Sequence, residues 1–128
     1  MKDTLDYTLT EDGAILLGVR TEAIELYLPA EIEGMPLIAI GERAFDSEDG
    51  RRLEKITLPP TIERIGDYAF YGCDRLKALR LPEKVRSIGR YAFYNCRKME
   101  AINIPLAATD LNTGLFLNCD SLRTLSFG

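Results

Sequence analysis

Apolar residues recur along the chain with a step of 23 positions, and prolines, phenylalanines and cysteines keep the same step. Two segments, IGDYAFYGCDRL at 65–76 and IGRYAFYNCRKM at 88–99, are nearly identical. A fixed period of about 20 to 50 residues indicates stacked coils, because each coil buries its apolar side only against its neighbours. The columns that keep the step are Pro59, Pro82 and Pro105; Phe70, Phe93 and Phe116; Cys73, Cys96 and Cys119; Leu53, Leu76, Met99 and Leu122; Ile56, Leu79, Ile102 and Leu125; and Leu58, Leu81, Ile104 and Phe127.

Each repeat contains an L-x-x-I-x-L pattern that predicts one short strand. In the third repeat, strand alternation turns Leu79 and Leu81 inward and Ala78 and Arg80 outward. The proline that follows cannot donate to a neighbouring strand, so it ends the strand. A period of about 20 to 29 residues with this core is typical of leucine-rich repeats, which form one strand and one return segment per coil. We therefore expect an α/β or mainly β fold, a curved leucine-rich-repeat solenoid with a parallel strand ladder.

The glycine and the phenylalanine of each repeat have predicted structural roles. Gly41, Gly66 and Gly89 each follow an isoleucine, and we expect them to supply a positive φ. The fourth repeat has Asn112 at this position, and asparagine tolerates a left-handed backbone better than most residues. Neighbouring strands of a ladder lie about 4.8 Å apart, so the repeated phenylalanines should form a column inside the solenoid.

The first 21 residues predict a β-hairpin that covers one end of the stack. Asp12-Gly13 is a two-residue turn signal. We expect residues 1–21 to form this N-terminal cap and residues 22–128 to form about four coils plus a terminal strand, all in one continuous domain. The residues that alternate on the arms of the hairpin are Tyr7, Leu9, Ile15 and Leu17.

The last repeat ends in LRTLSFG, and its apolar side chains have no following coil in this sequence. An open end of this kind exposes an unpaired strand edge and apolar surface, which favours association. A longer natural chain or a second chain would cover it, and we expect a homo-oligomer through this end. The candidate self-association residues are Leu117, Leu122, Leu125 and Phe127.

The frame L-x-x-I-x-I/L-P-x-x-V/I-x-x-I-G-x-x-A-F-x-x-C resembles the BspA-like, or Treponema pallidum-type, leucine-rich repeats. Residues 53–98 match it almost position for position, and IELYLPAEIEGMPLIAIGERAF resembles the common first coil of that family. The fourth repeat departs from the frame, with Leu111, Asn112 and Leu115 in place of I-G and A. The resemblance implies a scaffold without a catalytic motif, often found in bacterial surface proteins that bind other proteins, including host proteins in adhesion.

Charge is unevenly distributed along the chain. Residues 1–50 carry twelve Asp/Glu and three Lys/Arg, whereas residues 75–98 carry eight Lys/Arg and one Glu. The basic stretch is either a solvated face or a contact for an acidic protein, an acidic glycan or the acidic half of another copy. A nucleic-acid partner is not expected, because the sequence pI of about 4.9 lacks a basic footprint. The candidate basic surface consists of Lys77, Lys84, Arg86, Arg90 and Arg97.

The outward positions of the strands form a second candidate surface, on the predicted concave face. Solenoids bind ligands through extended surfaces of this kind. Binding hot spots are enriched in Trp, Tyr and Arg, and only Tyr27 and Arg80 qualify here. The candidate protein-binding residues are Glu25, Tyr27, Lys55, Thr57, Arg80 and Asn103.

Three other groups of residues favour structural roles. The cysteines are expected to be small buried hydrophobes rather than a disulfide or zinc site. The acidic segment 46–49 lacks the frame of a calcium loop, so a solvated loop is expected. Four tyrosines flank the repeated phenylalanines as an aromatic stripe, half of it structural: Tyr68, Tyr71, Tyr91 and Tyr94.

Catalysis has little support in the sequence. Histidine is absent, so no such base can activate a serine, and no glycine-rich phosphate loop is present. We expect no enzyme activity, no cofactor and no metal. No apolar run approaches the ~20 residues that span a bilayer, and the first residues lack signal-peptide character. The chain is then cytoplasmic, or secreted or on the cell surface, as the resemblance implies, if an export signal lies outside this sequence.

These observations predict a non-catalytic protein-binding scaffold module. A structural element that self-assembles through its last coil is the second hypothesis, and an enzyme with an unrecognised site is the third. The size and the salt dependence of self-association separate the first two, because electrostatic assembly weakens as salt rises and pairing through apolar ends does not.

Overall fold

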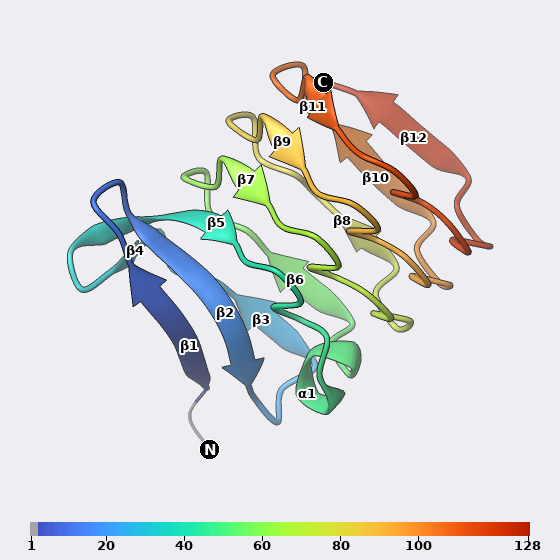
Figure 1. The fold of residues 1–128 in the computed structure, drawn as a ribbon. Coiled ribbons are helices and arrows are strands. Elements are labelled where there is room, and N and C mark those ends of the chain that lie inside the picture. Colours follow the sequence, from blue (N-terminus) through green and yellow to red (C-terminus); the bar gives the residue numbers. More distant parts are fainter. Residues whose placement is uncertain (1–2) are drawn as a thin grey trace.

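The computed structural model describes residues 3–128, and in it the chain forms a mainly β solenoid of stacked coils (Figure 1). The repeat frame divides the stack into coil 1 (22–52), coil 2 (53–75), coil 3 (76–98), coil 4 (99–121) and a terminal segment (122–128). In chain order the elements are β1 (Thr4–Leu9), β2 (Ala14–Arg20), β3 (Glu25–Tyr27), β4 (Glu31–Ile32), β5 (Met35–Ile40), α1 (Glu48–Arg51), β6 (Lys55–Thr57), β7 (Arg64–Ile65), β8 (Ala78–Leu79), β9 (Ser87–Ile88), β10 (Ala101–Ile104), β11 (Asp110–Leu111) and β12 (Thr124–Phe127).

The predicted ladder of L-x-x-I-x-L strands is present, and we call it the front ladder. It consists of β3, β6, β8, β10 and β12, and every pair that is hydrogen-bonded runs parallel. Equivalent residues of successive repeats lie opposite each other, as Leu79 and Leu125 do on either side of Ile102. The 23-residue register of the sequence is therefore the hydrogen-bonding register of the sheet.

A second parallel ladder, which the sequence did not predict, follows the I-G segments. This IG ladder runs β5–β7–β9–β11, and it forms a separate row of strands in Figure 1. The backbone N–H groups of Gly66 and Gly89 extend it by donating to the carbonyl oxygens of Ile40 and Ile65, at 2.7 and 2.8 Å. The IG ladder thus joins each coil to the next, and the front ladder does so on the other side of the core except between β6 and β8.

The predicted positive φ at Gly41, Gly66 and Gly89 is wrong. The positive φ values lie two residues later, for example 56° at both Tyr68 and Tyr91. Glycine is required for a different reason, because a Cβ on Gly89 would lie 2.5 Å from the backbone nitrogen of the preceding coil's Asp67. Coils 2 and 3 approach too closely at Gly89 for any side chain.

Asn112 replaces this glycine in coil 4 and keeps the coil-to-coil hydrogen bond by another route. Its side-chain Nδ2 donates to the carbonyl oxygen of Ile88 at 2.9 Å. In coils 2 and 3 the equivalent bond comes from the glycine backbone. An amide side chain therefore substitutes for the backbone N–H.

The predicted N-terminal hairpin is formed by β1 and β2, which pair antiparallel. Strand β2 then pairs in parallel with β5, so the hairpin continues the IG ladder over the end of coil 1. The connecting loop has four residues, 10–13, closed by Thr10 N–H donating to Gly13 O at 2.9 Å, rather than a two-residue turn. Residues 1 and 2 of the predicted cap lie outside the described residues.

On β2 buried side chains lie one position away from the predicted apolar residues Ile15 and Leu17. Ala14, Leu16 and Val19 are buried, whereas Leu9 and Leu17 are 44% and 49% exposed. The register of β1 shifts between Asp6 and Tyr7, so alternation does not continue uniformly along the arms.

Coil 1 is longer than the others because it carries two insertions. Strands β4 and β5 form a small hairpin whose turn residues Glu33 and Gly34 both have positive φ (52° and 80°), as a two-residue turn requires. The second insertion forms α1, one turn capped by Ser47, whose hydroxyl accepts from Gly50 N–H at 3.0 Å. Within residues 3–128 no helix has the length and apolar character to cross a bilayer.

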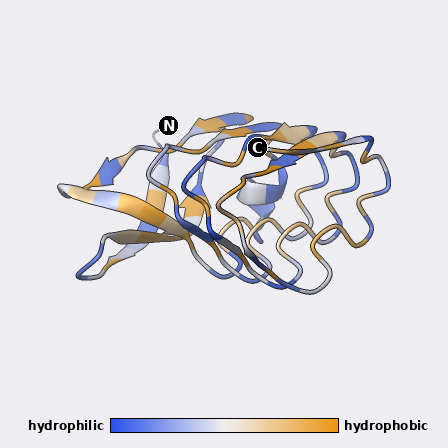
Figure 2. Cartoon of the chain, turned by 90° about the horizontal axis from the view of Figure 1, so that it is seen from above, coloured by the Kyte–Doolittle hydropathy of each residue, from blue (hydrophilic) through white to orange (hydrophobic). Residues whose placement is uncertain are grey.

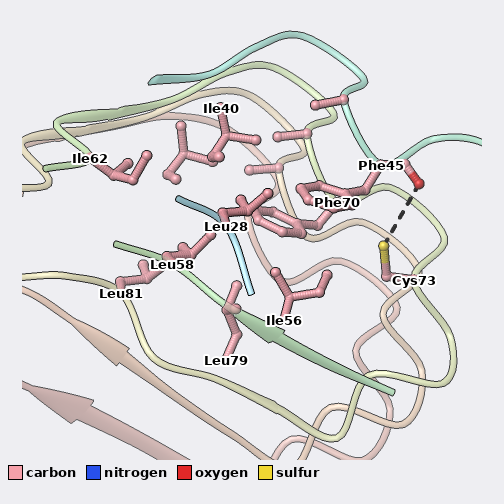
Figure 3. Packing of buried hydrophobic residues seen from close by; sticks show 14 of the residues in the cluster. Leu28, Ile40, Phe45, Ile56, Leu58, Ile62, Phe70, Cys73, Leu79 and Leu81 are labelled. Atoms are coloured by element: carbon pink, nitrogen blue, oxygen red, sulfur yellow. Dashed lines mark hydrogen bonds between the residues drawn. The ribbon is translucent and has the colours of Figure 1, made fainter. Parts of the chain in front are cut away.

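The core runs through the stack as columns of equivalent side chains, and polar and apolar segments alternate around each coil (Figure 2). The predicted phenylalanine column is confirmed. Phe45, Phe70, Phe93 and Phe116 stack with ring centroids 5.0, 5.4 and 5.8 Å apart. Figure 3 shows the aliphatic part of the core, where residues of both ladders meet Phe45 and Phe70. The spacing is that of the coils, so the aromatic column stabilises each coil on its neighbour.

Candidate functional site

The outward residues of the front ladder form a shallow face. Glu25, Lys55, Thr57 and Arg80 are exposed, and Tyr27 is 63% exposed. The Lys55 ammonium lies 5.7 Å from the centre of the Tyr27 ring, within cation–π range. The structure therefore presents these predicted residues to solvent on one face.

Asn103 does not belong to the accessible part of this face, which corrects its prediction as a binding residue. It is 3% exposed. Its Nδ2 donates to Leu81 O at 2.9 Å, and its Oδ1 accepts from Leu81 N–H at 2.7 Å. The side chain completes the sheet where β8 is too short to pair with β10, so both ends of its amide already bond to the Leu81 backbone.

The front ladder is interrupted between coils 2 and 3. Strands β6 and β8 belong to separate sheets, although every other neighbouring pair of the ladder is hydrogen-bonded. A cleft of about 760 Å³ lies along this break. Its lining comes only from the two strands and the segments next to them: Glu54, Lys55, Ile56, Thr57, Leu58, Pro60, Lys77, Ala78, Leu79, Arg80, Leu81, Pro82, Glu83 and Lys84.

The predicted basic surface separates into two parts. Arg86, Arg90 and Arg97 lie near carboxylates on the neighbouring coil, at 3.3 Å from Glu63, 3.2 Å from Asp67 and 3.8 Å from Asp120. Lys77 and Lys84 line the cleft instead. The predicted basic surface is therefore not one continuous patch, and of its five residues only Lys77 and Lys84 line the cleft beside the front-ladder face.

The last coil leaves apolar side chains and a strand edge open. Strand β12 ends its sheet, and all four of its residues are exposed. Of the predicted self-association residues, Leu117, Leu125 and Phe127 are 49%, 41% and 71% exposed, whereas Leu122 is half-buried. Leu106, at 80%, adds to this surface and was not predicted.

The four predicted tyrosines form a compact cluster. Tyr68 stacks on Tyr91 and Tyr71 packs on Tyr94, both with ring centroids 5.3 Å apart. Arg43 covers one face of the Tyr68 ring at 4.3 Å. All four tyrosine side chains are half-buried. Their rings pack against one another across the coil boundary, so the cluster connects coils 2 and 3.

The cysteines are free and point into the stack. Each thiol donates to the carbonyl oxygen of a phenylalanine one coil earlier: Cys119 to Phe93 at 3.0 Å, Cys96 to Phe70 at 3.2 Å and Cys73 to Phe45 at 3.9 Å (Figure 3). Burial raises the pKa of Cys73 to about 12. A protonated, hydrogen-bonded thiol is a packing group and a poor nucleophile.

The acidic segment of coil 1 is structured rather than a solvated loop. Asp46 accepts from Arg43 at 2.8 Å and from Arg51 at 2.6 Å. Asp49 accepts from the buried Thr21 N–H at 3.1 Å, which ties α1 to the residue after β2. In the described part of the chain, no three His, Cys, Asp or Glu side chains are grouped to hold a metal ion.

Comparison with known proteins agrees with the coil geometry. The family model for the BspA type leucine rich repeat region (6 copies) matches residues 38–128, more than half of the chain. The chain belongs to the BspA-type leucine-rich-repeat family. A comparison with curated proteins gives no match.

Several solved leucine-rich-repeat structures have the same fold as this chain. A leucine-rich repeat protein from Bacteroides capillosus ATCC 29799 is similar over 97% of this chain and 94% of its own, with a TM-score of 0.82 and 25% identity. The Treponema pallidum leucine-rich repeat protein is similar over 97% and 83%, with a TM-score of 0.72 and 22% identity. A leucine-rich cell surface protein from Faecalibacterium prausnitzii A2-165 is similar over 97% and 41%, with a TM-score of 0.73 and 23% identity. At these identities the likeness shows the fold.

The BspA-type repeat explains the columns of Leu, Ile, Phe, Gly and Cys as scaffold, and such repeats are typically non-catalytic. It does not dictate the outward residues of the strands. The cleft between β6 and β8 is lined in part by such outward residues, among them Lys55, Thr57 and Arg80.

Proposed function

We propose that this chain is a non-catalytic protein-interaction module that binds a partner through the front-ladder face. The observation that supports it is a face of exposed side chains, including Tyr27 at 63%, held on a scaffold whose own side chains are buried in columns. Tyrosine and arginine are the residues that contribute most at protein interfaces. A bacterial surface or surface-associated setting is part of the proposal, since one similar structure is described as a cell surface protein.

The test is capture of partners by immobilised chain, compared between two double variants. Tyr27→Ala with Glu25→Ala alters the front face, and Arg64→Ala with Ser87→Ala alters the IG-ladder face. We expect proteins from bacterial or host extracts to be retained by the wild type and by the IG-ladder variant, and lost with the front-face variant. Equal retention by all three chains contradicts the choice of face.

A second candidate function is self-assembly through the open last coil. The exposed β12 edge and Phe127, at 71% exposure, favour it. Light scattering over a concentration series should show association that Leu125→Asp with Phe127→Asp abolishes and that Tyr27→Asp leaves unchanged. A monomer at every concentration contradicts this candidate.

A further inference from the structure

We propose that the cleft between β6 and β8 binds an acidic, extended segment of a partner protein. The inference rests on the proposed function, because the cleft lies within the front-ladder face, and it specifies the chemistry of the partner. Three observations carry it: backbone groups without hydrogen bonds among the described residues, basic side chains without ion pairs there, and small side chains over apolar ones on the floor.

The first observation concerns backbone hydrogen bonds between coils 2 and 3. The repeat predicts them, and they are absent at the break between β6 and β8. At the neighbouring joints, Glu54 N–H donates to Ile24 O at 2.7 Å and Glu100 N–H donates to Lys77 O at 2.6 Å. The equivalent bond from Lys77 N–H to Glu54 O is missing within residues 3–128. Lys77 therefore has a free backbone donor, and Glu54 a free backbone acceptor.

A second predicted backbone hydrogen bond between coils 2 and 3 is also missing. Leu28 N–H donates to Thr57 O at 3.0 Å, but its counterpart from Leu58 N–H to Arg80 O is absent among the described residues. The Arg80 N–H also makes no hydrogen bond there. Unpaired strand edges bind extended backbone or charged acceptors, because a donor without a partner must otherwise stay hydrated.

The second observation is the state of the cations around the cleft. Lys55, Lys77, Arg80 and Lys84 line it and are exposed, and none of them forms an ion pair within residues 3–128. Every ion pair of the described structure uses an arginine elsewhere. The lining carries these four cations and two carboxylates, Glu54 and Glu83. The cleft is therefore positive, although the chain as a whole has a net charge of -4.

The third observation is the shape of the floor. Two of the outward residues that line the cleft, Thr57 and Ala78, are small, and the buried Ile56, Leu58 and Leu79 line it as well. A single extended segment can lay one side chain on such a floor and point the next toward the lysines, since its side chains alternate. Carboxylates placed there accept charge-assisted bonds from Lys77, Arg80 or their backbone N–H groups.

The experiment measures fluorescence anisotropy of a labelled peptide of about ten residues, a long strand's length, that alternates glutamate with leucine. A peptide with glutamine in place of glutamate is the probe control. We expect saturable binding of the glutamate peptide to the full chain, and binding at least about tenfold weaker for the glutamine peptide. Equal binding of both peptides overturns the proposal.

Matched variants locate the site. Lys77→Glu with Arg80→Glu should weaken glutamate-peptide binding by about tenfold or more, whereas Arg90→Glu with Arg97→Glu, the same change in charge elsewhere, should change it by less than about threefold. Ala78→Trp should block the cleft, and Ala101→Trp, one repeat later in a paired part of the ladder, should not. Thermal unfolding checks that each variant is folded. Equal loss with both charge reversals shows attraction to net charge and overturns the site.

Other occupants are outcomes of the same experiment. Competition by a single-stranded oligonucleotide or by heparin, stronger than by the peptide, overturns the protein-segment assignment. Peptide binding that falls as the chain self-associates means that the acidic half of another copy occupies the cleft, which also overturns it. If extracts yield front-face partners and the peptide does not bind, the inference fails while the proposed function stands. If the peptide binds and extracts yield no partner, the cleft assignment stands while the proposed function fails its own test.

Discussion

At the scale of single residues, the closeness of successive coils explains the repeated glycine. A Cβ on Gly66 would lie 2.8 Å from the nitrogen of Glu42, and one on Gly89 would lie 2.6 Å from the carbonyl carbon of Gly66. Contacts with backbone cannot be relieved by a rotamer change. The glycine column therefore sets how tightly the IG ladder can stack.

Gly89→Ala should lower the free energy of unfolding by about 2 kcal/mol or more, because the new methyl group must push the coils apart. Gly18→Ala is the matched control, since its Cβ meets nothing closer than 3.4 Å, at the Asp6 carboxylate. Urea unfolding of both variants measures the difference. Similar midpoints for the two would show that the coils separate at little cost.

The sequence predicted which side chains are buried better than it predicted the conformation of the backbone. The columns of Phe and Leu could be placed because burial is the only role that keeps such side chains at a fixed step. The role of Gly89 could not, since a sequence does not distinguish positive φ from lack of space. Asn103 was wrongly predicted to be a binding residue. Strand alternation predicts on which face of the sheet a side chain lies, but not which groups it hydrogen-bonds to.

At the scale of elements, the coils are joined by two ladders rather than one. The IG ladder was not predicted, because strands of two residues such as β7 and β9 are too short to show alternation. The break between β6 and β8 was also unforeseen. Residues on both sides of it follow the same repeat, so the pattern predicts pairing there as elsewhere.

Side chains add to the backbone bonds between coils. Asp67 Oδ1 accepts from Arg90 N–H at 2.8 Å, and its Oδ2 accepts from the Arg90 guanidinium at 3.2 Å. Asp67→Ala should lower the free energy of unfolding by about 1 kcal/mol, chiefly because the Arg90 backbone N–H loses its hydrogen bond to the Asp67 carboxylate. Thermal or urea unfolding checks it.

Asp120→Ala is the control for this prediction. Asp120 lies 3.8 Å from Arg97, and both side chains are more than half exposed. Such a pair contributes little, so we expect a change below about 0.5 kcal/mol. A loss at Asp120 as large as at Asp67 would assign the stabilisation to charge rather than to the backbone hydrogen bond.

At the scale of the whole molecule, the two ends of the stack formed by residues 3–128 differ in how far they are covered. The hairpin β1–β2 covers coil 1, and Leu16 on β2 is fully buried. At the other end Phe116 is only half-buried, although Phe70 and Phe93 in the same column are fully buried. Each coil of a solenoid is stabilised by its neighbours, so coil 4 lacks part of what stabilises coils 2 and 3.

Amide hydrogen exchange should reveal this gradient. We expect the amides of β7 and β9 to be protected most, and those of β11 and β12 to exchange faster, because local opening costs least where few buried contacts are broken. Dilute and concentrated samples separate the two proposed surfaces. Protection that rises with concentration in β12 alone supports assembly through the open end, and added salt should leave it intact, since pairing of apolar surface is not screened.

The same measurement with the glutamate peptide should instead protect Lys77, Ala78 and Arg80, whose N–H groups border the break in the front ladder. The two effects lie in different coils, so one exchange map distinguishes a scaffold that binds through its face from one that assembles through its end. Uniform protection along the stack, unchanged by concentration or peptide, would contradict both. It would also show that coil 4 is as stable as the coils enclosed on both sides.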